Sequence, residues 1–201
     1  MIRILLAEDQ GMVRGALASL LELEPDFSVV AQVGRGDEVL DAAAAHDPDV
    51  CLLDIEMPGM TGLEAAELLQ RDRPATKVLV LTTFGKPGYL RRAMQHGASG
   101  FLLKDAPASQ LANAIRRALA GERVVDPGLA AAALAAQENP LTPREREVLA
   151  AARTGEPVAE LAGKLHLSHG TARNHLSAAM GKLGARSRAE AVRRADDEGW
   201  L

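Results

Sequence analysis

Short apolar runs alternate with amphipathic stretches through the first 120 residues of the chain. The apolar runs are bounded by polar or turn-forming residues, which is typical of strands buried in a sheet. Between them, apolar positions recur every three or four residues, the spacing of an amphipathic helix. The predicted strands are Ile2–Ala7, Phe27–Val33, Val50–Leu53, Lys77–Leu81 and Phe101–Leu103, with helices at 12–21, 39–45, 62–70, 89–95 and 107–120. Because strand and helix alternate, we expect an α/β fold with a parallel sheet and helices on both faces.

The pattern after residue 139 is helical throughout. Thr142 and Glu145 have the spacing of a capping box, so a helix is expected to begin here. Further helices are predicted from Pro157, after Ser168 and after Ser187. Only a short connection separates the second of these four helices from the third, which carries basic and amide side chains. This arrangement predicts a helix-turn-helix.

The segment between the two halves breaks both patterns. Glycine and proline residues at 121, 127 and 128 interrupt it, and the stretch from Leu129 to Gln137 is nearly all alanine and leucine, which favours a helix. We therefore expect a first domain of residues 1–120, a partly helical linker of residues 121–139, and an all-α second domain of residues 140–201.

Polar residues follow the carboxyl ends of the predicted strands: Glu8, Asp9, Asp54, Thr82 and Lys104. In a parallel sheet these ends meet at one edge, where ligands and reactive groups gather. Taken alone, Asp54 is equally well explained as an ordinary loop acid or a helix cap, and Thr82 as a residue that caps the next helix. The convergence of all five on one edge indicates a site.

These residue types suit phosphoryl transfer to a carboxylate. Clustered carboxylates bind Mg²⁺, which offsets the charge of an incoming phosphoryl group. Asp54 is the expected nucleophile and would form an aspartyl phosphate. Lys104 offers a positive charge and Thr82 a hydroxyl to the phosphoryl oxygens; the alternative for Lys104 is a surface ion pair with Asp105. Phe84 is expected to hinder water at the acyl phosphate.

Charge is unevenly distributed along the chain. The net charge is −4, yet between residues 164 and 194 seven side chains are basic and one is acidic. A basic segment suits a polyanionic partner, although a solvated helix face has the same composition. Arginine pairs with guanine and asparagine with adenine, so Arg173 and Asn174 are candidates for base contacts. Lys182, Arg186 and Arg188 suit phosphates.

The first half of the chain resembles the receiver domain of two-component response regulators, through Glu8-Asp9, Asp54 followed by Met57-Pro58-Gly59, Thr82 and Lys104. The resemblance implies a flavodoxin-like (βα)5 fold in which Asp54 accepts a phosphoryl group from a sensor histidine kinase. It also implies roles for the neighbouring residues. Mg²⁺ would be held by Asp9, Asp54 and the backbone carbonyl of Glu56 with help from Glu8, and Thr82 and Phe101 would form a switch pair.

The second half resembles the LuxR-type DNA-binding domain, through LTPREREVL and LHLSHGTARNHLSAAMGKLGARSRAEAV. The whole chain is therefore similar to a NarL/FixJ-type response regulator, and LTTF, PGY, GTARN and the ending EGWL resemble the DesR-type subgroup. The resemblance implies a homodimer, formed on phosphorylation, that binds promoter DNA with inverted half-sites. The DNA-contacting residues implied are Thr171, Arg173, Asn174, Ser177, Lys182, Arg186 and Arg188.

We expect the last helix to help pair the DNA-binding domains, through Ala191, Val192 and Ala195. The alternative for Val192 is a place in the core of its own domain. Both alternatives are compatible with an apolar side chain on an amphipathic helix.

The function expected from these patterns is a phosphorylation-switched transcription factor. Its only chemistry would be autophosphorylation from phosphodonors and slow self-dephosphorylation. Two alternatives stay open: a Mg²⁺-dependent phosphatase or kinase-like enzyme, and a DNA-binding protein whose receiver acts without phosphorylation. The single cysteine, Cys51, excludes an intrachain disulfide and a cysteine-based zinc site. An acidic start and the lack of a membrane-length apolar run predict a cytoplasmic protein.

Overall fold

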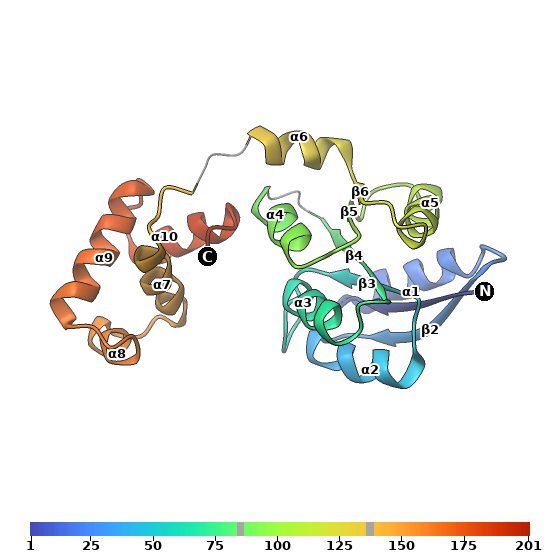
Figure 1. Cartoon of the computed structure of the whole chain (residues 1–201), viewed down its shortest axis with the longest axis horizontal. Helices are drawn as coiled ribbons and strands as arrows, with labels where there is room; N and C mark the ends of the chain where they lie inside the picture. Colours follow the sequence, from blue (N-terminus) through green and yellow to red (C-terminus); the bar gives the residue numbers. More distant parts are fainter. Residues whose placement is uncertain (84–86, 136–138) are drawn as a thin grey trace. The chain divides into compact units, whose positions relative to one another are not determined.

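The computed structural model describes residues 1–83, 87–135 and 139–201, which form two compact units (Figure 1). The first unit consists mainly of residues 1–131 and the second mainly of residues 132–201. Phe84 and Gln137, which the sequence interpretation invoked, lie outside the described residues.

The first unit is built on a parallel sheet in the order β2-β1-β3-β4-β5-β6. Its strands are β1 (Ile2–Ala7), β2 (Phe27–Val33), β3 (Val50–Asp54), β4 (Lys77–Thr82), β5 (Gly100–Leu103) and β6 (Val124–Val125). The first five have the strand order of flavodoxin-like folds. The predicted fold class is confirmed, and the sixth strand is an addition that the sequence pattern did not predict.

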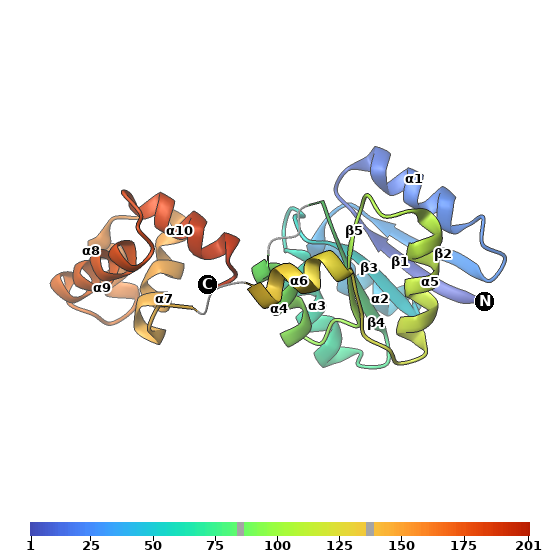
Figure 2. The same ribbon diagram turned by 90° about the horizontal axis from the view of Figure 1, so that it is seen from above.

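Helices cover both faces of this sheet (Figure 2). They are α1 (Gly11–Leu21), α2 (Val39–His46), α3 (Gly62–Asp72), α4 (Pro87–Gln95) and α5 (Ala108–Leu119), with a short 3-10 turn at Gly36–Glu38. Helices α1 and α5 pack on one face, where Leu6, Leu52, Leu79 and Ile115 belong to one buried cluster. Helices α2, α3 and α4 lie on the other face. Burial on both faces explains why the central strands read as continuous apolar runs.

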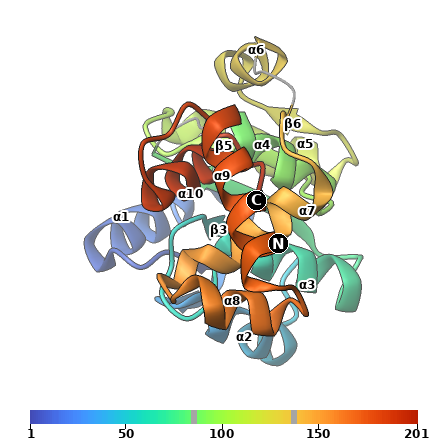
Figure 3. The same ribbon diagram turned by 90° about the vertical axis from the view of Figure 1, so that its left-hand side faces the viewer.

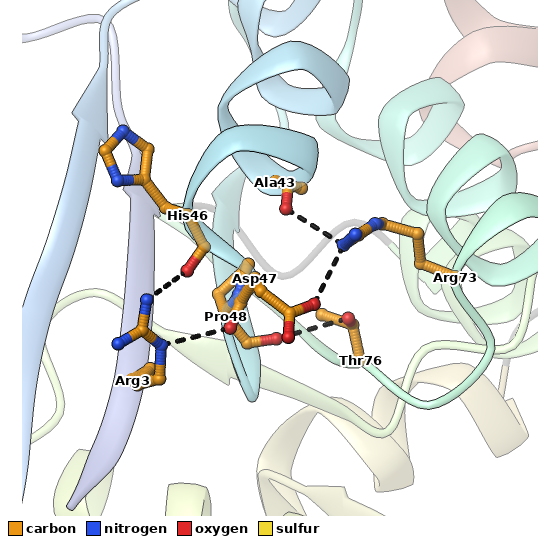
Figure 4. Close-up of polar contacts among 7 residues, drawn as sticks. All are labelled: Arg3, Ala43, His46, Asp47, Pro48, Arg73 and Thr76. Carbon is orange, nitrogen blue, oxygen red and sulfur yellow. Dashed lines mark hydrogen bonds and ion pairs between the residues drawn. The ribbon is translucent and has the colours of Figure 1, made fainter.

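Two arginines hold the connection between α2 and β3 at the amino-terminal edge of the sheet (Figure 4). Asp47 ends α2 in a left-handed conformation, with φ of 40°. Arg3 donates to the backbone carbonyls of His46 and Asp47, and Arg73 donates to the carbonyl of Ala43 at 2.9 Å and to Asp47 Oδ1 at 3.1 Å. These bonds satisfy carbonyls that the helix end leaves unpaired, and so fix where β3 begins.

The start of the predicted linker belongs to the sheet of the first unit. The Val124 N–H donates to the carbonyl of Ser99 at 2.9 Å, and the Asp126 N–H donates to that of Phe101 at 3.1 Å. Helix α6 (Pro127–Ala135) follows at once, and Asp126 Oδ1 caps it by accepting from the N–H of Leu129 at 3.1 Å. The predicted helix in the linker is therefore present, although it begins earlier than the alanine-rich stretch.

Within the described residues 139–201, the second unit folds into four α-helices (Figure 3), as the sequence pattern predicts. They are α7 (Pro143–Ala151), α8 (Val158–Lys164), α9 (His169–Lys182) and α10 (Arg188–Asp197), with a 3-10 turn at Ala152–Thr154. The predicted capping box starts α7, because Thr142 and Glu145 exchange backbone-to-side-chain hydrogen bonds. Val148, Leu161 and Trp200 lie in the core that these helices share. Within the three described ranges, no helix has the length and apolar character needed to span a membrane.

Candidate functional site

An acidic cluster lies where β1 and β3 end. The two strands pair with Ala7 opposite Leu53, so the next residue of each chain segment, Glu8 and Asp54, lies beside the other. Asp54 is 6% exposed and Glu8 is 1% exposed, whereas Asp9 faces solvent. One carboxylate oxygen from each of the three lies within 4.8 Å of the others. The predicted convergence of these side chains on one edge of the sheet is therefore present.

Lys104 bridges the two buried acids from the end of β5. Its Nζ lies 2.6 Å from Glu8 Oε2 and 2.9 Å from Asp54 Oδ1, and its side chain is only 8% exposed. Burial raises the pKa of Glu8, because it outweighs the neighbouring Lys104 ammonium, which favours the anion. Burial alone would lower the pKa of Lys104, but its ion pairs with Glu8 and Asp54 together outweigh burial and raise it. Lys104 is thus committed to these acids rather than to Asp105.

The donor set of this cluster fits a small divalent cation. Glu8 Oε2 is buried, and no donor within the described residues makes a well-aligned hydrogen bond to it, although the Lys104 ammonium lies close by. Two acids facing one lysine leave a local excess of negative charge, and carboxylate oxygens are the ligands of hard cations. The cluster of Glu8, Asp9 and Asp54 can therefore hold a metal ion.

The loop after Asp54 is held by a close approach of two backbones. The Gly36 N–H donates to the carbonyl of Pro58 at 3.0 Å. A side chain at Gly36 would bring its Cβ within 1.8 Å of the Met60 carbonyl oxygen, so only glycine fits. Gly59 has φ of 82°, a conformation that favours glycine. These contacts fix the loop that carries Glu56, whose side chain is exposed.

Thr82 and Phe101 lie on the same face of the sheet. Phe101 in β5 pairs with Val80 in β4, and side chains two apart on a strand share a face, so Thr82 also points to the face of Phe101. The Lys104 N–H donates to the Thr82 carbonyl at 2.8 Å. Phe101 is 0% exposed, so its ring lies fully inside the first unit.

Helix α9 presents an exposed polar face in the second unit. Ala172, Leu176 and Ala179 are buried, and this spacing turns the opposite side of the helix to solvent. The predicted DNA-contacting residues of α9 are all exposed: Thr171, Arg173, Asn174, Ser177 and Lys182. The structure therefore brings basic and amide groups together on one accessible face.

Two of the predicted phosphate-binding cations also make contacts inside their own unit. Lys182 Nζ lies 2.7 Å from Glu145 Oε2, and Arg188 donates to the backbone carbonyls of Gly155 and Glu156. The pKa of Glu145 is lowered, chiefly by its hydrogen bond from Lys182 and then by the backbone N–H of Thr142. Sequence spacing did not reveal these internal partners.

The predicted dimer-forming residues of α10 lie largely in the interior. Ala191 and Ala195 are 0% exposed and belong to the core of the second unit, so their side chains offer no surface to a partner chain. Small residues at these positions let α10 pack closely on its neighbours. Val192 is partly buried against the same core and retains some exposed surface. Of the three, only Val192 stays a candidate for a dimer contact.

Arg14 is a residue near the site that the sequence interpretation missed. Its guanidinium donates to the backbone carbonyl of Glu8 from α1. It also lies against Gly34, where an added Cβ would come within 3.0 Å of Nη1. An arginine whose partner is a backbone carbonyl leaves no distinctive spacing in the sequence.

The chain matches two family models, a response regulator receiver domain over residues 4–116 and the luxR family of bacterial regulatory proteins over residues 139–195. It is 46% identical to the transcriptional regulatory protein DesR of Bacillus subtilis over 201 residues, which cover 100% of both chains. It is 34% identical to the nitrate/nitrite response regulator NarL of Escherichia coli, with 94% of this chain and 92% of NarL covered. Among solved structures, it resembles the response regulator ChrA of a heme-sensing two-component system, at 32% identity and a TM-score of 0.60, covering 100% and 98% of the two chains.

Proposed function

The chain belongs to the NarL/FixJ-type response regulators, transcription regulators that join a receiver to a LuxR-family DNA-binding domain, and we propose that Asp54 is its phosphoacceptor. The proposal rests above all on one observation. Lys104 holds the Asp54 carboxylate at 2.9 Å, beside Glu8 and Asp9. We assign residues 1–120 to the receiver, 121–139 to the linker and 140–201 to the DNA-binding domain.

The phosphoryl donor is a phosphohistidine on a sensor histidine kinase or a small phosphodonor. An oxygen of Asp54 attacks the phosphorus, the bond from phosphorus to the donor breaks, and an aspartyl phosphate forms. The histidine imidazole leaves with a proton taken from solvent, whereas a small donor such as acetyl phosphate releases acetate, which leaves as an anion and needs no proton. Lys104 then pairs with a phosphoryl oxygen, and the Thr82 hydroxyl donates to another.

Asp9, Asp54 and the backbone carbonyl of Glu56 would hold Mg²⁺, with Glu8 in support. Two features support this assignment. Asp9 is exposed, and within the described residues the buried Glu8 Oε2 accepts no well-aligned hydrogen bond. When bound, the metal ion supplies positive charge that offsets the charge of the transferred phosphoryl group. This chemistry allows the protein to phosphorylate itself from a phosphodonor and to dephosphorylate itself slowly, and we propose no other reaction for it.

Phosphorylation acts on the DNA-binding unit through a shift in conformational populations. The phosphoryl group adds about −1.5 to −2 charges and new acceptor oxygens near Thr82. Inward placement of Phe101 is favoured when Thr82 is drawn to the phosphoryl oxygens. To move such an equilibrium from 1:99 to 99:1, phosphorylation must favour the active state by about 5.5 kcal/mol.

The active protein is a cytoplasmic homodimer that binds promoter DNA with inverted half-sites. Arg173 and Asn174 contact base edges in the major groove, flanked by Thr171 and Ser177. Arg186 contacts a phosphate, and Lys182 and Arg188 add positive charge beside it. The exposure of the α9 face supports this placement, and Val192 on α10 is the proposed dimer contact.

Binding of the full-length protein to a library of genomic DNA fragments, at one stated salt concentration, tests this function. The arms are with and without acetyl phosphate and Mg²⁺, for the wild type and for Asp54→Asn. Asp41→Asn, a change at an exposed acid on α2, is the matched control. We expect acetyl phosphate to enhance binding in the wild type and control but not in Asp54→Asn. Binding that is indifferent to acetyl phosphate would contradict the switch, and no selective binding would contradict the DNA-binding assignment.

A further inference from the structure

The carboxyl-terminal end of α9 is capped by an arginine from α10. Helix α9 ends at Lys182, and Gly184 follows in a left-handed conformation with φ of 60°. The last carbonyls of a helix have no partner within the helix. Arg194 Nη1 donates to the carbonyl of Leu183 at 2.7 Å and to that of Gly184 at 3.2 Å. A guanidinium is suited to this place because it is cationic and carries several donors in a fixed plane.

Glu190 joins this arginine to the turn between α9 and α10. Its Oε1 accepts from Arg194 Nη2 at 2.7 Å, and its Oε2 accepts from the backbone N–H of Arg186 at 2.8 Å. The Glu190 N–H also donates to Ser187 Oγ at 3.1 Å, which starts α10. One carboxylate thus connects both ends of the turn formed by residues 183–187.

The two neighbouring arginines on α10 differ in these contacts. Arg194 donates to two backbone carbonyls and one carboxylate. Arg193 is exposed, and in the described part of the chain its guanidinium makes no hydrogen bond or ion pair. Arg186, which the turn carries, is exposed as well. The turn is therefore fixed from α10, while its own cationic side chain stays accessible.

We propose that Glu190 and Arg194 are positioning residues for DNA recognition, which hold the turn of residues 183–187 so that α9 and Arg186 meet the DNA in a fixed relation. This inference rests on the DNA-binding function proposed above. Arg194 itself does not contact a phosphate in this arrangement. A recognition helix whose end is loosely held can still associate with phosphates, but it loses the alignment that base contacts require.

Salt dependence separates positioning from a direct phosphate contact. Each phosphate neutralised by a cation contributes about 0.9 to the slope of log K against log salt concentration. Loss of a phosphate contact therefore lowers the slope by about 0.9. Loss of a positioning residue weakens specific binding and leaves that slope nearly unchanged. It also leaves non-specific binding nearly unchanged, because misaligned phosphate contacts can form anywhere on DNA.

The experiment compares full-length variants on a DNA fragment selected by the wild type and on unrelated DNA of equal length, each over a salt series. Arg194→Met removes the cap, Arg194→Gln keeps a neutral donor for the carbonyls, and Arg193→Met is the matched loss of charge. Thermal unfolding of each variant is recorded, so that affinities are compared at equal folded fraction.

We expect Arg194→Met to weaken specific binding by about tenfold more than Arg193→Met, the size of one lost hydrogen bond to a charged group. Non-specific affinity and the salt slope should match those of Arg193→Met, and Arg194→Gln should recover part of the specific affinity. A slope lowered by about 0.9 in Arg194→Met alone would overturn the inference in favour of a phosphate contact. Equal specific affinity of Arg194→Met and Arg193→Met would also overturn it. If the wild type selects no DNA fragment, the proposed DNA-binding function is wrong. If the wild type does select one, the differences between the variants test only whether Arg194 is a positioning residue.

Discussion

The backbone N–H of Asp126 donates to the carbonyl of Phe101 at 3.1 Å, and the side chain of Asp126 caps the helix that follows. The strand that carries the proposed switch residue is therefore hydrogen-bonded to the first residues of the linker. A shift of β5 at Phe101 moves the acceptor of this bond. The start of α6 is thus linked to β5 through the backbone and the side chain of Asp126.

Replacement of Asp126 by alanine should weaken this coupling. The side chain accepts from the N–H groups of Gly128 at 2.8 Å and Leu129 at 3.1 Å, and loss of such a cap costs about 1 kcal/mol. We expect a matching fall in the free energy of unfolding of the first unit and a smaller effect of acetyl phosphate on DNA binding. Phosphorylation of Asp54 itself should be unchanged. The measurements are urea unfolding, acyl-phosphate labelling and DNA affinity with and without acetyl phosphate.

Asp126→Asn is the control, because an asparagine oxygen can accept the same two hydrogen bonds. It should behave as the wild type. If Asp126→Ala retains the full effect of acetyl phosphate on DNA binding, the linker is not coupled through this cap.

The sequence pattern predicted the central sheet well but missed this connection, for a physical reason. Strands β1, β3 and β4 are buried on both faces, so they read as apolar runs. Strand β6 has only Val124 and Val125, and two residues cannot establish a period. Its place in the sheet depends on backbone hydrogen bonds to Ser99 and Phe101, and every residue type except proline can donate such bonds.

Lys104→Met should separate metal binding from phosphoryl transfer. Without the ammonium, Glu8 and Asp54 are two facing carboxylates, and their mutual repulsion favours a divalent cation between them. We therefore expect Lys104→Met to bind Mg²⁺ more tightly than the wild type does, as measured by calorimetry. Phosphorylation by acetyl phosphate should slow by about a hundredfold, as for loss of one preorganised charge.

Lys77→Met, at the opposite end of β4, is the matched loss of charge and should change neither quantity. Unaltered phosphorylation of Lys104→Met would show that this lysine only stabilises the buried acids.

Sequence reasoning located the members of this site because a parallel register brings strand ends together. It did not locate their partners. Lys104 turned to the acids of β1 and β3 rather than to the adjacent Asp105, and Lys182 pairs with a residue 37 positions away. Arg14 and Arg194 donate to backbone carbonyls, which every residue type supplies. Such choices depend on three-dimensional packing and leave no periodic signal.

An arginine in α5 should give the first unit a measurable dependence on acid. Arg116 donates to Asp26 at 2.9 and 2.6 Å and to Glu24 at 2.7 Å, and it lies 4.7 Å above the Phe27 ring. The hydrogen bond from Arg116 lowers the pKa of Asp26 below its ordinary value of 3.8. A carboxyl whose pKa is lowered by folding stabilises the folded state at pH values above its pKa in the unfolded chain. This contribution is lost as the pH falls through its pKa in the folded state.

Arg116→Met should therefore be less stable than the wild type at pH 6, and the difference should shrink below pH 3.8. Urea unfolding between pH 6 and pH 3 measures it. Arg117→Met, which removes the adjacent exposed arginine and its contact to Glu122, is the control and should show a smaller difference. A difference between Arg116→Met and the wild type that stays constant with pH would mean that packing on Phe27, rather than the ion pair, carries the effect.

Gly36→Ala should disturb the site without touching a reacting group. The new Cβ would lie 1.8 Å from the Met60 carbonyl oxygen, so the loop after β3 must move away. Overpacking of this kind costs about 1–3 kcal/mol. Because that loop carries the Glu56 carbonyl, we expect weaker Mg²⁺ binding and slower phosphorylation of Asp54, measured by calorimetry and by acyl-phosphate labelling.

Gly15→Ala is the control, since a Cβ there meets open space within α1 and alanine favours a helix by about 1 kcal/mol. If Gly36→Ala binds Mg²⁺ as tightly as Gly15→Ala does, then the Glu56 carbonyl is not a ligand or its position does not depend on Gly36.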